Sequence, residues 1–271
     1  MPPMISLPSL IGPYFPGSAL KIERAEKHIR ELHRELTAYQ STFPYDITVE
    51  HDANTGYESL CVVPFESVPE RLMCIAGDAI HNLRTALDYA ASDIEFSTTG
   101  QRGEHTGFPV RNTRKGVEDA INGGFKHKAP AGVCDFVLNV IQPYLGGNGH
   151  PIWQLHRLDI LDKHKLLLAQ MHIQRIRNVR CKDETGKAFM VHELATIPNS
   201  RALVQVRTGH RNVEVTDKGK AASEIFFGEG TPCERSAILP SLDEFKIFVG
   251  RTLFTLGAEF QRLRPVGSLW P

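Results

Sequence analysis

Residues 75–94 read IAGDAIHNLRTALDYAASDI and predict one helix with two different faces. At 100° per residue, small and branched apolar side chains cover one broad face, and polar side chains gather within about 120° on the opposite side. The apolar face consists of Ile75, Ala76, Ala79, Ile80, Leu83, Ala86, Leu87, Ala90 and Ile94. The polar side consists of Asp78, His81, Arg84, Thr85 and Asp88.

The composition of this polar side is unusual for a surface that faces water. Between Arg71 and Ile94 there is neither Lys nor Glu, although these residues favour helices and usually cover exposed faces. Asp, His, Asn and Thr form helices less readily and can make fixed hydrogen bonds instead. Because a buried charge must be paired, we expect Arg84 to contact Asp88, Asp78 or a carboxylate from elsewhere. Such a network is consistent with a functional site or with a purely structural role.

A second concentration of polar side chains is the stretch HRLDILDKHK, residues 156–165. It is predicted to end a helix and to enter a strand, a kind of junction that leaves side chains free to project into a cleft. Asp162 and His164 are near enough in sequence for the carboxylate to fix the tautomer of the imidazole, as in a general base. The alternative is a helix C-terminus at which Lys163, His164 and Lys165 only favour the negative end of the helix dipole.

Together the two segments predict an enzyme that uses acid–base chemistry. Its candidate catalytic residues are Asp78, His81, Arg84, Asp88, Asp162 and His164. The two imidazoles would transfer protons, and Asp88 and Asp162 would orient them. Arg84 would stabilise an anionic substrate group or a developing oxyanion. The reaction class expected first is hydrolysis.

Two other interpretations of the same residues remain open. Asp78 with His81, and His156 with Asp159, each place a carboxylate and an imidazole one helical turn apart. Two such helices facing each other could supply four ligands to zinc, manganese or iron, so a divalent metal cofactor is one alternative. The other is a non-catalytic binding or regulatory module, in which these polar residues hold the helices in register.

The rest of the chain predicts an α+β fold in which a helical bundle packs with an antiparallel β-sheet in a single domain, residues 1–271. An irregular arm is expected over 1–17, a mainly helical region over 18–165, a sheet over 166–230 and a closing helix over 241–264. A β-hairpin around Asn54-Thr55-Gly56 interrupts the helices. Capping boxes are predicted at Ser67 with Glu70 and at Ser241 with Glu244. Helices are expected at 18–40, 67–94, 115–122, 130–142 and 151–162, and strands at 45–51, 57–63, 166–176, 187–195, 203–206, 213–215 and 224–227.

Charge and composition exclude some classes of partner. Thirty-one basic residues balance thirty-one acidic ones, so no net field favours duplex DNA or a membrane. No apolar run approaches the ~20 residues of a membrane span, and residues 1–17 do not resemble a signal peptide. Five scattered cysteines without a C-x-x-C pair indicate reduced thiols. A cytoplasmic protein with a small-molecule or RNA substrate is expected, and a homo-oligomer is left open.

Two motifs carry a resemblance. GDAIHNLRTALD, residues 77–88, followed by QPY at 142–144 and LDILDKHK at 158–165, is similar to a group of bacterial proteins of uncharacterised function. An Arg followed at short spacing by a His on a bundle helix, as in Arg157 and His164, resembles more distantly the HEPN superfamily. Many members of that superfamily are ribonucleases, so the resemblance implies phosphodiester cleavage of RNA.

Overall fold

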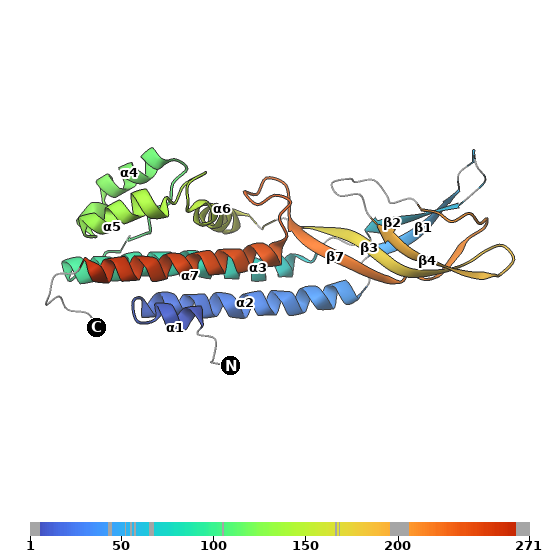
Figure 1. Ribbon diagram of the computed structural model, residues 1–271, viewed down its shortest axis with the longest axis horizontal. Helices are drawn as coiled ribbons and strands as arrows, with labels where there is room; N and C mark the ends of the chain where they lie inside the picture. The colour runs from blue at the N-terminus through green and yellow to red at the C-terminus, as the bar shows by residue number, and fades with distance from the viewer. Residues whose placement is uncertain are drawn as a thin grey trace. The chain divides into compact units, whose positions relative to one another are not determined.

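A computed structural model of the chain describes residues 6–42, 45–51, 53–54, 56, 58–64, 68–104, 106–165, 167, 169–195 and 206–263. The contacts divide the chain into two compact units, whose elements are labelled in Figure 1. The helical unit comprises Met1–His33, Glu70–Leu168 and Glu229–Pro271, and the sheet unit comprises Arg34–Pro69 and Ala169–Gly228. The expectation of a single domain stays a prediction.

The helical unit is built on long helices joined by shorter ones. Its elements are α1 (Leu7–Ile11), the first part of α2 (Pro16–Ser41), α3 (Glu70–Thr99), α4 (Arg114–Gly123), the 3-10 turn η1 (Phe125–His127), α5 (Ala131–Phe136), the π-helix η2 (Val137–Ile141), α6 (His150–His164) and α7 (Ile238–Arg262). α3 contacts both α6 and α7, and α6 also contacts α7. α7 also contacts α1 and α5, so α3 and α7 together form the centre of the unit.

The apolar face predicted for α3 is confirmed. All of its members are buried except Ile75, which is half-buried. The helix continues to Thr99, beyond the predicted end near Ile94, and the hydroxyls of Thr98 and Thr99 donate to carbonyls one turn earlier. Of the predicted capping box, Glu70 is the first residue of α3, while Ser67 lies outside the described residues.

Other helix boundaries differ from the sequence prediction. The arm expected to be irregular contains α1, because Pro8 fits the first turn of a helix and the Ser6 hydroxyl accepts from the Ser9 N–H. The capping box at Ser241 was wrong. α7 begins at Ile238, three residues earlier, because Pro240 is tolerated within a first turn. The helix expected to end near Gln142 is α5 continued by η2, and it stops where Gln142 takes a positive φ of 54°.

The sheet unit holds two antiparallel sheets. β1 (Tyr45–His51) pairs with β2 (Glu58–Pro64), and β2 pairs with β5 (Val206–Arg207), which confirms the predicted hairpin. In the other sheet, β3 (Ala169–Lys182) pairs on one edge with β4 (Ala188–Ala195). On its other edge it pairs with β7 (Lys220–Phe227) and then with β6 (Glu214–Asp217).

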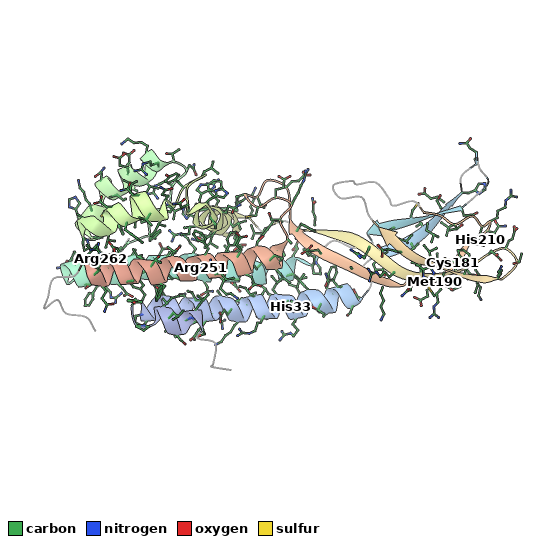
Figure 2. All side chains as sticks on the ribbon, in the orientation of Figure 1. His33, Cys181, Met190, His210, Arg251 and Arg262 are labelled. Carbon is green, nitrogen blue, oxygen red and sulfur yellow. The ribbon has the colours of Figure 1, made fainter. Side chains whose placement is uncertain are left out.

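A small apolar core joins the strands of the sheet unit. It consists of Tyr45, Ile47, Leu60, Val62, Ile176, Val179, Cys181, Leu194 and Val213. Cys181, labelled in Figure 2, is fully buried, whereas Met190 on β4 is exposed. His210 stacks on Phe189 with 4.1 Å between ring centroids. The helices of one unit and the antiparallel sheets of the other establish the α+β class.

Candidate functional site

The centre of the candidate site is a hydrogen bond between α3 and α6. His81 Nδ1 lies 2.8 Å from Asp159 Oδ1. Asp159 is only 3% exposed, whereas the His81 side chain is 50% exposed. Because a carboxylate only accepts hydrogen bonds, Nδ1 carries the proton and Nε2 of the neutral ring is an acceptor. Nε2 has a weaker neighbour, the Thr85 hydroxyl at 3.4 Å.

The second oxygen of the same buried carboxylate is paired with a cation. Lys163, four residues after Asp159 on α6, places its Nζ 2.6 Å from Asp159 Oδ2. A buried carboxylate needs such a partner because desolvation of a lone charge is costly. Asp159 is therefore held between an ammonium and an imidazole, and this fixes the ring of His81.

Asp162 lies one turn further along α6, half-buried against the backbone of α3 at Gly77. It makes no hydrogen bond within the part of the chain that the structure describes. Removal from water raises the pKa of Asp162, and the negative charges of Asp159 and Asp78 raise it further, against a smaller opposing effect of His81. Asp78 itself is exposed. Three of the predicted residues, Asp78, His81 and Asp162, thus belong to one group.

Arg84 belongs to a separate, closed network. Its Nε donates to His156 Nδ1 at 3.1 Å, its Nη1 to Asp88 Oδ1 at 2.7 Å and its Nη2 to the Phe108 carbonyl at 3.0 Å. Asp88 also accepts the Phe108 N–H at 2.8 Å. Arg84 is 6% exposed, so the expected contact with Asp88 is confirmed. Each nitrogen of the guanidinium donates to another group of the protein. This geometry does not support the predicted role of Arg84 in binding an anionic substrate group.

His156 completes this network as a neutral acceptor. Burial lowers the pKa of His156 to about 4, and the positive charges of Arg84, Arg111 and Lys163 contribute, against Asp159. A neutral ring at ordinary pH can accept the Arg84 Nε–H through Nδ1. The four residues of the metal hypothesis are thus divided between two networks. Among the described residues, no group of three or more His, Cys, Asp or Glu is placed to hold a metal ion.

A second carboxylate on α3 holds the loop that follows the helix. Glu95 is buried and accepts from the Gly103 N–H and the Thr106 hydroxyl, and it pairs with Lys128 at 3.3 Å. Together with the bond from Phe108 to Asp88, this fixes the segment that leads into residue 108. Two carboxylates of α3, those of Asp88 and Glu95, therefore hold the backbone of the loop that follows the helix.

The pairing of acids with imidazoles differs from the sequence prediction. Asp88 holds Arg84, and His81 is oriented by Asp159, which the sequence analysis considered only as a metal ligand. His164 is exposed at the end of α6 and makes no hydrogen bond or ion pair with the described residues. The sequence did hold a sign of the role of Asp159. By helical periodicity Asp159 lies on the same face of α6 as the buried residues Leu155 and Leu158, which marks it as a buried carboxylate.

Comparisons with known proteins add no further constraint. No family model, curated protein or solved structure matches the chain. No helix within the described ranges is both long and apolar enough to cross a membrane.

Proposed function

We propose that the helical unit carries the acid–base active site of a hydrolase, with His81 as general base and Asp159 as the group that orients it. One observation supports this proposal above all. A buried carboxylate fixes one ring nitrogen of a histidine whose other side is open to solvent. That arrangement is what a general base needs, because tautomer and orientation are set before substrate arrives.

The proposed chemistry takes place at the second ring nitrogen of His81, Nε2. Nε2 of neutral His81 would accept a proton from a water molecule as that water attacks the substrate. The resulting imidazolium would be stabilised by the Asp159 carboxylate, which is already in contact with Nδ1. Lys163 holds the other oxygen of this carboxylate in place. The Arg84 network would hold α3 and α6 at the spacing that this contact requires.

A phosphodiester, either a small molecule or RNA, is the substrate class that we would test first. The HEPN resemblance names the same reaction, but it is carried by Arg157 and His164, and the site proposed here depends on His81 and Asp159 instead. The balanced overall charge favours a small or single-stranded substrate over duplex DNA, which requires many phosphate contacts.

The test is His81→Ala, assayed on bis(p-nitrophenyl) phosphate and on a labelled single-stranded RNA. We expect a rate loss of about 10²-fold or more, the range of a missing general base. The Tm should change little, because half of the His81 side chain faces solvent. His192→Ala, at an exposed position on β4, is the matched control and should keep full activity. Full activity in His81→Ala would end the proposal.

A non-catalytic module is the second candidate, and the closed Arg84 network favours it. All three guanidinium nitrogens are used to join α3, α6 and the Phe108 backbone, as expected of residues that hold helices in register. In that case the wild-type protein would cleave neither probe.

A further inference from the structure

Gly77 is an unusual residue for its position. It is buried in the interior of α3, about two turns after the helix begins at Glu70. Glycine in a helix interior is unfavourable because it loses more backbone freedom than alanine on folding. Its φ is not positive, so the backbone does not require glycine. The reason for its presence must lie in what packs against it.

The group that packs against Gly77 is the carboxyl of Asp162. A Cβ added at Gly77 would stand 2.6 Å from both Cγ and Oδ1 of Asp162, closer than atoms of this kind approach each other. The absence of a side chain at residue 77 therefore lets the Asp162 carboxyl rest on the α3 backbone. There the charges of Asp78 and His81 of α3 and of Asp159 of its own helix act on the Asp162 carboxyl.

This placement keeps the carboxyl away from its usual partners. Within the described residues no donor bonds to Asp162, while the neighbouring cation Lys163 is engaged with Asp159. Two carboxylates act on Asp162 against one imidazole. Desolvation and like charge both favour the neutral acid, which is the form that can donate a proton beside the proposed base.

We propose that Asp162 is the proton donor of the site and that Gly77 is the positioning residue that seats it there. This inference rests on the proposed function. It assigns the role of base to His81 and the role of acid to Asp162. His81 is bonded to a carboxylate, whereas Asp162 lies near like charge and is partly removed from water, a difference typical of acid–base pairs.

The step balances as an ordinary hydrolysis. A lone pair of water forms the new bond to phosphorus while His81 Nε2 takes the proton of the water. The bond from phosphorus to the leaving oxygen breaks, its electron pair stays on that oxygen, and the Asp162 carboxyl supplies the proton. Solvent then returns a proton to Asp162 and removes one from His81. A donor of this kind matters most for alkoxide leaving groups, so esters of ordinary alcohols are the inferred substrate class.

A double-mutant cycle on stability tests whether Gly77 positions Asp162, and it needs no substrate. Gly77→Ala should lower the Tm in the wild-type background, because the new methyl group meets the Asp162 carboxyl. In the Asp162→Ala background the same change should raise the Tm, since alanine favours a helix. Gly123→Ala, where an added Cβ meets nothing within 4 Å, controls for helix propensity. Equal effects of Gly77→Ala in both backgrounds would contradict the positioning role of Gly77.

Carboxyl-carbon NMR of the full chain tests the donor. The pKa of Asp162 should lie above the ordinary aspartate value in the wild-type protein. It should fall toward that value in Gly77→Ala, as the carboxyl is pushed toward water. An ordinary pKa for Asp162 in the wild-type protein would refute the donor role, whatever the outcome of the activity assays.

Leaving-group dependence then separates this inference from the proposed function. On thymidylyl-(3′→5′)-thymidine, whose leaving group is an alkoxide, Asp162→Asn should lose about 10²-fold or more in rate. On bis(p-nitrophenyl) phosphate, whose leaving group needs no proton, the loss should stay below about tenfold. Equal losses on the two probes would exclude Asp162 as donor even if His81 proves essential. Inactivity of the wild-type protein on both probes would instead count against the proposed function. The stability and NMR results would still show whether Gly77 positions Asp162 and whether the pKa of Asp162 is raised.

Discussion

Two polar clusters lie between α3 and α6, and they differ in how completely their groups are satisfied. Around Arg84, each guanidinium nitrogen donates to a protein acceptor, and Asp88 accepts from both Arg84 and the Phe108 N–H. Around His81, one ring nitrogen is fixed by Asp159 and the other has only a distant hydroxyl neighbour. In the first cluster every guanidinium nitrogen is engaged, whereas in the second one imidazole nitrogen has only a weak neighbour and the Asp162 carboxyl has no hydrogen bond among the described residues.

If the proposed function holds, this difference separates structural from functional polar residues on one helix. Both clusters use the same residue types at the same helical spacing, so composition alone could not divide them. What divides them is burial, since Arg84 is 6% exposed while half of the His81 side chain faces water. Removal of a group from the closed cluster should cost stability, and removal of a group from the open cluster should cost activity.

The largest expected effect is on stability, at Arg84. Arg84→Met would leave the Asp88 carboxylate, the His156 nitrogen and the Phe108 carbonyl without their donor. Breaking a buried charged pair by removing one partner costs about 3–5 kcal/mol. We expect a loss of that order in the free energy of unfolding, measured by urea denaturation.

Arg102→Ala is the matched control for this change. Arg102 also bonds to an α3 carboxylate, that of Asp93 at 2.9 Å, but its side chain is 54% exposed. An exposed ion pair is worth about 0–1 kcal/mol, so this variant should unfold near the wild-type midpoint. If Arg84→Met proved no more costly than Arg102→Ala, the closed cluster would not be structural.

The next effect concerns the pH dependence of stability, through His156. Burial lowers the pKa of His156 from its ordinary value of 6.5 to about 4. Between these two values the unfolded chain binds more protons than the folded one, so His156 should make the protein less stable as pH falls from about 6.5 toward 4. His156→Gln should flatten this dependence, as seen in denaturation series across that pH range.

A histidine outside both clusters provides the control for His156→Gln. His164→Gln removes an exposed imidazole that has no partner among the described residues, and it should leave the pH slope as in the wild type. A slope unchanged by His156→Gln would show that the His156 ring is not held neutral by the Arg84 network.

Much of the fold was predictable because periodicity and turn chemistry are local signals. The apolar face of α3, the hairpin of β1 and β2 and the antiparallel character of the later strands all followed from residue spacing. The capping box predicted at Ser241 places the start of α7 too late, because Pro240 lies within the first turn of the helix. Proline fits both places, and only the packing of Ile238 distinguishes them.

The residues of the site were predicted better than their partners. Asp78, His81 and Asp162 do come together, and Arg84 does meet Asp88. The helical phase of α6 marks Asp159 as a buried position, but its pairing with His81 also depends on which turn of α6 faces which turn of α3. Asp159, Asp162 and Asp88 are all one or two turns from a histidine in sequence, and tertiary packing selects the one that binds.

The smallest expected effect is at His164, and it tests the comparison most directly. This histidine was expected to pair with Asp162, yet it is exposed at the end of α6 and unbonded within the described chain. An exposed side chain without partners usually changes stability by less than about 0.5 kcal/mol when replaced. His164→Ala should therefore change both the Tm and the cleavage rate only slightly, by less than about threefold in rate, whereas His81→Ala removes most of the activity. A large loss at His164 with His81 dispensable would reverse the assignment, and the end of α6 would then be the catalytic element.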